Sequence, residues 1–257
     1  MTPHMLLLAA AASLIALSAQ AAPVVGLTGD KTLVWFDTEK PEISKTVEVT
    51  GVDRLLGIDL RPGDGRVYGV AADGAIVTID LESGAATAGA KLSTVLPEGV
   101  MASVDFNPAA DRLRIMGSDG TNLRAHPDTG EVMTDGALNF EAGDANAEAT
   151  PNIVATAYIN SYGKPEKTAM YDIGADGTFI QQIKPNDGTL KTIGALGVMS
   201  DTYAFDVQTT ADGTNTAWLV AGGGLHTVDL MTGKATRTAD IAGSPGALRD
   251  IAILPAM

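Results

Sequence analysis

The sequence predicts an all-β fold, a β-propeller of five four-stranded blades, and three observations support this prediction. First, an alternating strand that runs into a tight turn recurs along the chain, and these turns end at residues 41, 84, 130, 188 and 233. Second, a hairpin turn in which Gly stands beside Asp or another Gly precedes each of these strands. Third, the residues before the first turn and after the last one together make one further repeat. Repeats of this length with four short strands each are typical of propeller blades.

The first 21 residues are expected to be a cleaved secretory signal. An apolar run from Met5 to Leu17 is followed by the small-residue pattern Ala19-Gln20-Ala21, and cleavage is expected after Ala21. The run is too short to span a bilayer. The chain has 0 Cys, which excludes a lipid-bearing cysteine, disulfides and thiolate metal sites. We therefore expect a periplasmic or secreted protein in which residues 22–257 form a single propeller domain.

The first complete blade is predicted from four alternating segments. They are LLGIDLRP (55–62), RVYGVAA (66–72), AIVTIDLE (75–82) and ATAGAKL (86–92). The hairpin between the second and third segments contains Asp73-Gly74, a strong hairpin signal because Gly tolerates the positive φ of such turns. Each remaining blade is expected to begin with a segment resembling the first of these: SVDFNP (103–108), TAYINS (156–161), YAFDVQ (203–208) and ALRDIAILP (247–255).

The last blade is predicted to combine both ends of the chain. ALRDIAILP (247–255) supplies its inner strand, and VVGL (24–27) and LVWF (33–36) supply the next two strands. Pairing the C-terminal strand with the N-terminal strands closes the ring and removes its edges. An open β-sandwich would explain the alternation of residues but not this arrangement of the ends.

The charge of the chain excludes some classes of partner. Lys+Arg 17 against Asp+Glu 31 gives a formal net charge of −14. Phosphate binding needs clustered Lys and Arg, so nucleic acid and anionic membranes are disfavoured. The charge is compatible with cationic partners, with divalent ions or simply with solubility. We expect a monomer that is not embedded in a membrane.

Several motifs resemble a known family. They include VDFNPAADRLRI, GTNLRAHPDTG, PNIVATAYINS, QQIKPNDGTLKTIGALG and the closing RDIAILP. The chain resembles the bacterial domain-of-unknown-function family 4394 over about residues 24–255. The resemblance implies an exported domain, and it implies no activity and no catalytic residues.

Candidate ligand-binding residues are expected around one mouth of the central channel. That mouth should be lined by the starts of the inner strands, the loops before them and the hairpins between second and third strands. The candidates are Arg54, Asn122, Arg124, Asn152, Asp201, Tyr203, Arg249 and Asp250. Arg249 begins an otherwise apolar strand, so its guanidinium is expected to pair with an acid or a ligand anion. The alternative is that all of these are ordinary solvated loop residues.

A candidate metal site is formed by Asp59, Asp105 and Asp206, which occupy the same place in three inner strands. Carboxylates converging from three blades would suit Ca²⁺ or another divalent cation that prefers oxygen ligands. The alternative is structural, because an Asp before a turn can accept backbone N–H bonds and tie its strand to that turn. Tyr158 and Ala252 hold this place in the other two blades, so any ring of carboxylates is incomplete.

The remaining polar features are less specific. The acidic loop 140–152 is the longest irregular connection, and we expect it to reach the mouth as a lid, an ion site or a mobile surface loop. His126 is interpreted as a turn residue and His226 as a residue on a strand face. After signal removal only these two histidines remain, which leaves little for catalysis.

Two functional hypotheses follow. The first is a non-enzymatic exported propeller that binds a small molecule or a protein at the channel mouth. The alternative is a divalent-ion-dependent hydrolase, similar to a lactonase or a phosphoesterase, in which Asp105, Asp206 and Asn152 or the acidic loop hold an ion that polarises a carbonyl or activates water. A purely structural or adhesive role is a third option. We favour the first hypothesis, in which the protein is not an enzyme.

Overall fold

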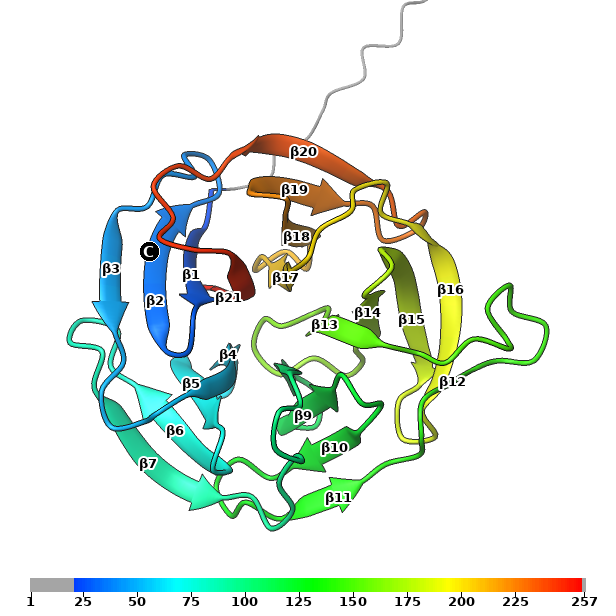
Figure 1. Ribbon diagram of the computed structural model, residues 1–257, viewed down its shortest axis with the longest axis horizontal. Coiled ribbons are helices and arrows are strands. Elements are labelled where there is room, and N and C mark those ends of the chain that lie inside the picture. Colours follow the sequence, from blue (N-terminus) through cyan, green and yellow to red (C-terminus); the bar gives the residue numbers. More distant parts are fainter. Residues whose placement is uncertain (1–20, 256–257) are drawn as a thin grey trace, which may run out of the picture.

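A computed structural model that describes residues 21–255 contains five small, mainly antiparallel sheets arranged around a common axis, as Figure 1 shows. The predicted five-bladed propeller is confirmed. The predicted signal over residues 1–21 lies outside the described residues except for Ala21. The part of the chain that is described contains no helix long and apolar enough to cross a membrane.

Four blades are continuous in sequence, and the chain passes through each of them from the inner strand to the outer strand. Blade A contains β4 (Leu55–Arg61), β5 (Arg66–Ala71), β6 (Ala75–Ile79) and β7 (Ala86–Lys91). Blade B contains β8 (Ala102–Asn107), β9 (Arg112–Gly117), β10 (Asn122–Ala125) and β11 (Val132–Thr134). Blade C contains β13 (Ile153–Tyr158), β14 (Met170–Gly174), β15 (Thr178–Lys184) and β16 (Thr189–Ala195). Blade D contains β17 (Tyr203–Thr209), β18 (Asn215–Ala221), β19 (Gly224–Val228) and β20 (Ala235–Asp240).

Blade E joins the two ends of the chain, as the sequence predicts. Its strands are β21 (Leu248–Ile253), β1 (Pro23–Thr28), β2 (Thr32–Asp37) and β3 (Lys45–Glu48). β21 pairs antiparallel with β1, so that Val24 lies opposite Ile253 and Leu27 opposite Asp250. The ring is therefore closed by main-chain hydrogen bonds between its first and last strands.

Blade C departs from the predicted pattern in two ways. The inner strand was expected over residues 156–161, but β13 ends at Tyr158 because the chain turns at Asn160, which has a φ of 64°. A fifth strand, β12 (Asn139–Phe140), pairs parallel with β16. The acidic loop follows β12 and projects outward from the ring (Figure 1), held where Asp144 Oδ2 accepts the N–H of Thr192 at 2.7 Å. Most of this loop therefore lies away from the channel mouth, and only its last residues, which lead into β13, approach the entrance face.

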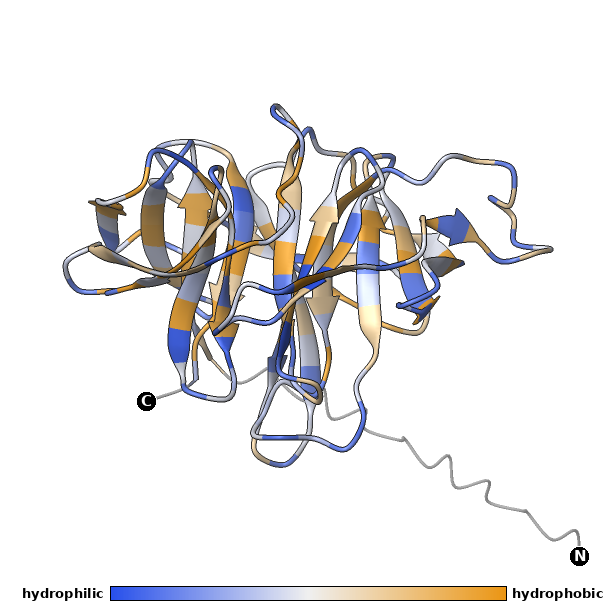
Figure 2. Ribbon diagram, turned by 90° about the horizontal axis from the view of Figure 1, so that it is seen from below, coloured by the Kyte–Doolittle hydropathy of each residue, from blue (hydrophilic) through white to orange (hydrophobic). Residues whose placement is uncertain are grey.

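The core lies between neighbouring blades. Alternation along the inner three strands of each blade places apolar side chains on the faces that meet the next blade, and Figure 2 shows these bands along the strands. The ring centroids of Tyr68 and Phe106 lie 5.3 Å apart across blades A and B, and those of Phe179 and Phe205 lie 6.0 Å apart across blades C and D. The outer strands β7 and β20 bury almost nothing.

The turns that end at residues 41, 84, 130, 188 and 233 also form contacts between neighbouring blades. Each turn joins the third strand of a blade to its fourth strand and abuts the outer part of the preceding blade. At Gly130 the φ is 73°, and a Cβ atom there would lie 2.0 Å from the carbonyl oxygen of Lys91 in blade A. No side chain fits at that distance, so the glycine permits both the turn and the contact.

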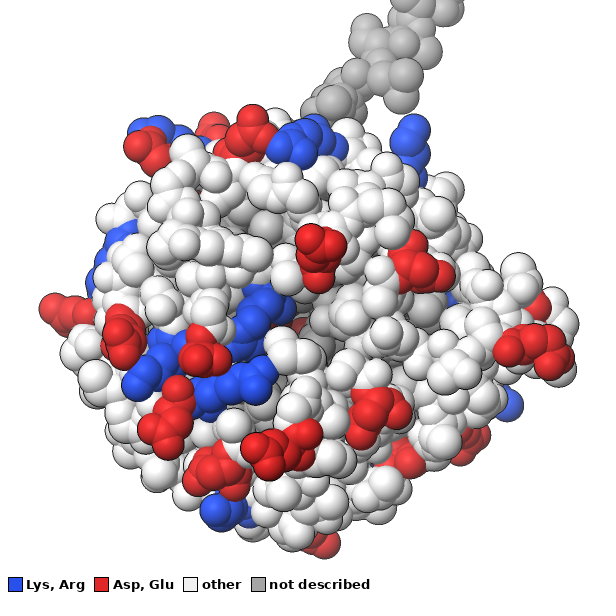
Figure 3. All heavy atoms as spheres, in the orientation of Figure 1, with Lys and Arg blue, Asp and Glu red and all other residues white. Residues whose placement is uncertain are grey.

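Charge is unevenly distributed on the face seen in Figure 1. Figure 3 shows acidic side chains scattered over this face and basic side chains gathered beside the central hollow. The inner strands begin on this face, which we call the entrance face, and they end on the opposite face, which we call the exit face.

Candidate functional site

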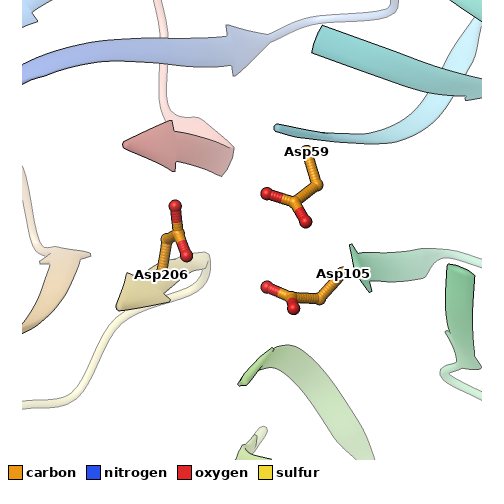
Figure 4. Close-up of side chains that lie close together, drawn as sticks. All are labelled: Asp59, Asp105 and Asp206. Carbon is orange, nitrogen blue, oxygen red and sulfur yellow. The ribbon is translucent and has the colours of Figure 1, made fainter. Parts of the chain in front are cut away.

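The carboxylates of Asp59, Asp105 and Asp206 meet near the axis. They project from β4, β8 and β17 toward one another, as Figure 4 shows. One carboxylate oxygen from each residue lies within 4.8 Å of the others. The three residues are 6%, 4% and 7% exposed. The structure thus brings together the three acids that occupy equivalent places in the sequence repeat.

Each of these carboxylates also links its blade to the inner strand of the next blade. The N–H of Phe106 donates to Asp59 Oδ2 at 2.7 Å, and the N–H of Ile253 donates to Asp206 Oδ2 at 2.6 Å. The N–H of Tyr158 donates to Asp105 Oδ1 at 3.2 Å. Inner strands have an edge without a strand partner, and their buried N–H groups need acceptors. The structural role expected from the sequence, a bond from each Asp to its own turn, is therefore replaced by a bond between blades.

One carboxylate oxygen of the cluster accepts no hydrogen bond from a backbone N–H group of the described residues. Asp59 and Asp206 use their second oxygens to accept the N–H of the following residue, Leu60 and Val207, each at 2.6 Å. Asp105 Oδ2 accepts no hydrogen bond from any described residue. It is the oxygen of the cluster most available to an added cation.

Burial and mutual repulsion change the protonation of the cluster. Burial raises the pKa of Asp59 well above its ordinary value, and the charge of Asp206 raises it further. Burial also raises the pKa of Asp105, with added repulsion from Asp59 and Asp206. Burial raises the pKa of Asp206 to about 6. Near neutral pH the cluster therefore holds protons unless a cation takes their place.

A cavity of about 380 Å³ opens beside the cluster on the exit face. Asp59 and Asp206 contribute to its lining. Its other polar side chains come from the turn after β13, the end of β17 and the residue after β17: Ser161, Tyr162, Gln208, Thr209 and Thr210. The sequence pattern favoured binding at the starts of the inner strands, which is the opposite end of the ring.

A fourth buried carboxylate lies one layer closer to the entrance face. Asp250 Oδ2 accepts the N–H of Ile58 at 2.8 Å, and its Oδ1 accepts the N–H of Ile251 at 3.1 Å. A Cβ atom at Gly57 would lie 2.6 Å from Asp250 Oδ2, so glycine is needed for this close approach. Burial raises the pKa of Asp250 to about 8. Asp250 therefore links blades E and A inside the ring and does not line the mouth.

The other candidates on the entrance face differ in their surroundings. Arg249 was expected to pair with an acid or an anion, but its guanidinium donates to four backbone carbonyl oxygens. Arg54 lies beside it and is partly exposed. Tyr203 is buried, and its hydroxyl donates to the carbonyl of Val198. Asn152 and Asp201 are exposed on this face.

Asn122 and Arg124 do not reach the channel mouth. They lie in β10, the third strand of blade B, where Arg124 pairs with Asp135 at 2.9 Å. Asp135 also pairs with the fully buried Arg114 at 2.6 Å, and Arg114 donates to Asn122 Oδ1. The hairpin signal placed these two residues near the mouth, but their side chains are held by this internal ion network.

Apart from Asp59 and Asp206, the polar residues that line the exit-face cavity are not among those that the sequence pattern singles out. Gln208 follows Asp206 by two positions, so strand alternation places both side chains on the same face of β17, and this signal was available. Ser161 and Tyr162 belong to the turn after β13, where nothing local indicates a cavity. His126 and His226 lie where expected, in a turn and on a buried strand face.

Comparison with known proteins gives a family and a fold. Residues 32–252 match the family described as Domain of unknown function (DUF4394). A search of curated proteins finds no match. A solved protein of unknown function from Bacteroides thetaiotaomicron is 16% identical with a TM-score of 0.54, over 91% of this chain and 65% of that one. Another, from Bacteroides caccae, is 12% identical with a TM-score of 0.45, over 91% of this chain and all of that one.

Proposed function

The chain belongs to the DUF4394 family, whose description names no function, and we propose from its site that it is a binding protein. In this proposal Asp59, Asp105 and Asp206 hold a divalent cation at the floor of the exit-face cavity, and the cation helps to bind a small polar ligand in that cavity. The observation that carries the proposal is the convergence of three buried carboxylates beside a cavity large enough for such a ligand.

The spacing of the carboxylates favours Ca²⁺ over Mg²⁺. Ca²⁺ takes oxygen ligands at about 2.3–2.6 Å, so two oxygens on opposite sides of one ion lie about 4.6–5.2 Å apart. The three oxygens here lie within 4.8 Å of one another, which suits ligands around a single Ca²⁺. Mg²⁺ needs near-octahedral geometry at about 2.0–2.1 Å, and carboxylates held by backbone N–H groups of neighbouring blades adjust less readily to this than to the flexible geometry of Ca²⁺. Water or the ligand would supply the remaining oxygens.

Thermal unfolding of residues 22–257 tests the cation. After chelation, Ca²⁺ should raise the midpoint saturably, by an amount equivalent to about 2.7 kcal/mol at one hundred times Kd, and Mg²⁺ should have a smaller effect. Asp105→Asn should abolish the shift because it removes the oxygen that accepts no hydrogen bond. Glu166→Gln is the matched control, since it removes one exposed acid in the turn after β13. If none of the ions changes the unfolding midpoint, the cation proposal is rejected. The three carboxylates would then be stabilised by the protons that they share.

A divalent-ion-dependent hydrolase is the second candidate. It is favoured by one observation, that two of the three carboxylates line the cavity directly, so a bound cation would face a substrate there. The cavity lining, over the residues described, contains no histidine to act as a general base. Ester, lactone and phosphoester substrates should therefore show no Ca²⁺-dependent turnover. Turnover that Asp105→Asn abolishes would replace the binding proposal with this one.

We also propose that the protein acts outside the cytoplasm. The apolar run from Met5 to Leu17, the Ala19-Gln20-Ala21 pattern and the lack of cysteine support this location. N-terminal sequencing of protein recovered from the periplasm or the medium should begin at Ala22. Recovery of the uncleaved chain from the cytoplasm alone would contradict it.

A further inference from the structure

Two basic side chains meet at the β1–β2 hairpin on the entrance face. The guanidinium of Arg249 reaches the carbonyl oxygen of Asp30 at 3.1 Å, and Arg54 Nε lies 3.6 Å from Asp30 Oδ1. The neighbouring Lys31 is instead paired with Glu48 at 3.5 Å. Figure 3 shows Lys and Arg atoms beside the central hollow of this face. In a chain with a net charge of −14, this is a local reversal of sign.

Arg249 is a fixed positive charge. It donates to the carbonyl oxygens of Gly29 at 2.7 Å, Leu55 at 2.6 Å and Leu56 at 2.8 Å, in addition to that of Asp30. These bonds hold the guanidinium in place without an ion pair to a carboxylate of any described residue. Burial lowers the pKa of Arg249, the charge of Asp250 opposes this, and the nearby charge of Arg54 lowers the pKa further. The two guanidinium groups therefore repel each other, and an anion between them would relieve that repulsion.

Arg54 has donors that lack good acceptors. Its Nη2 donates to the thioether sulfur of Met101 at 2.9 Å, and a thioether is a weak acceptor. Its Nε is buried and has no hydrogen-bond partner. The nearest carboxylate, that of Asp30, is 76% exposed and can turn toward solvent. A buried, unpaired donor on a charged group is costly, so this guanidinium has capacity for a stronger acceptor.

We propose that the entrance face binds a small oxyanion, either the carboxylate of an organic acid or inorganic phosphate, on Arg54. The planar guanidinium matches either anion with two parallel hydrogen bonds, and Arg249 adds a fixed positive charge. Arg54 immediately precedes β4 and Asp59 lies five residues further along the chain, so their Cα atoms lie about 16 Å apart. The acidic side chains scattered over the entrance face disfavour extended polyanions there. This site is separate from the proposed cation site.

Titration calorimetry at pH 7 tests the anion site, with inorganic phosphate and with acetate as probes at constant ionic strength set by chloride. The chelated protein should bind at least one probe saturably. Arg54→Gln should weaken that binding at least tenfold. Arg54→Lys, which keeps the charge but loses the planar pair of donors, should weaken it less. Arg66→Gln is the control, because Arg66 is an exposed arginine paired with Asp64 at the other end of blade A.

The two probes distinguish the sources of the anion. Binding of phosphate alone assigns the site to phosphate, and binding of acetate assigns it to organic acids. Absence of saturable binding for both probes, or equal binding by Arg54→Gln and the unsubstituted protein, would overturn the proposal. Thermal unfolding of each variant confirms that it is folded. Because these titrations contain no divalent ion, their failure would not affect the proposed cation.

Discussion

At the residue scale, the interior of the ring contains carboxylates that serve as acceptors for backbone N–H groups. Asp59, Asp105, Asp206 and Asp250 each accept an N–H from the inner strand of another blade. Asp172 in β14 is also fully buried; its Oδ1 accepts the hydroxyl of Thr156 at 2.6 Å, and its Oδ2 has no partner. Burial raises its pKa to about 7. These acids give the fold a stability that depends on pH.

The direction of the pH dependence follows from the raised pKa values. Asp206, Asp172 and Asp250 have a pKa of about 6, 7 and 8 when folded, against 3.8 for an ordinary aspartate. The native state then binds more protons than the unfolded chain between about pH 4 and pH 8, and the free energy of unfolding falls as pH rises through this window. Aspartates with lowered pKa values, such as Asp111, are ionised in both states above about pH 5 and contribute no slope there.

Urea unfolding in chelator checks this expectation. The free energy of unfolding should be at least about 2 kcal/mol lower at pH 8 than at pH 5.5, since one pKa unit corresponds to about 1.4 kcal/mol. Asp250→Asn should reduce the slope because it removes the highest of the three titrations. Ca²⁺ should also reduce it by displacing protons from the cluster. A stability that rises with pH over this range would contradict the buried, protonated state of these acids.

Arg61 joins two blades with a single side chain. It donates to both carboxylate oxygens of Asp111 and to both of Asp128, at distances of 2.7 to 3.1 Å. Arg61 itself is 8% exposed, whereas the two aspartates are about half exposed, and solvent weakens their attraction. Arg61→Met should lower the free energy of unfolding by about 2 kcal/mol. Arg112 is partly exposed and donates only to backbone carbonyls among the described residues, so Arg112→Met should change the free energy of unfolding by less than about 0.5 kcal/mol in the same urea titration.

At the element scale, the turn between third and fourth strands does two tasks. It reverses the chain, and it contacts the preceding blade. Gly130→Ala should lower the free energy of unfolding by about 3 kcal/mol, because it adds a Cβ atom 2.0 Å from the Lys91 carbonyl to the strain of a φ of 73°. Gly120→Ala has a φ of 87° with nothing within 4 Å of the added atom, so it should cost only about 1 kcal/mol. Equal losses would show that the turn does not support the contact between blades.

The sequence predicts the elements better than it predicts the contacts between them. Strand order and ring closure follow from the repeat, because apolar alternation and turn glycines are local signals. The meeting of Asp59, Asp105 and Asp206 also follows, since equivalent places in equivalent strands face the axis. The outward course of the acidic loop does not, because it depends on Asp144 reaching Thr192, which lies 48 residues away.

The location of the cavity is also beyond local signals. The entrance and exit faces both carry polar turns, and which end is filled depends on how side chains pack around the axis. At the entrance, the side chains of Arg249 and Asp250 form hydrogen bonds with the backbone of blade A. At the exit, space remains beside Gln208 and the turn after β13.

At the scale of the whole molecule, stability depends on the last strand. β21 supplies the inner strand of blade E, and the N–H of Ile253 and the carboxylate of Asp250 bond to blades D and A. Deleting residues 248–257 removes these bonds and exposes the edge of β1 together with buried Leu27. The truncated protein should lose its cooperative thermal transition. Truncation after Pro255, which leaves β21 complete, should unfold like the full-length chain.

The closure of blade E has a consequence for biosynthesis. Val24 is synthesised long before its partner Ile253. Until the ribosome has made β21, β1 has no inner neighbour, and the main-chain groups along that edge stay unpaired. Contacts so distant in sequence form slowly because a large loop must close first. The ring of the nascent chain thus remains open until β21 emerges, and blade E can be completed only then.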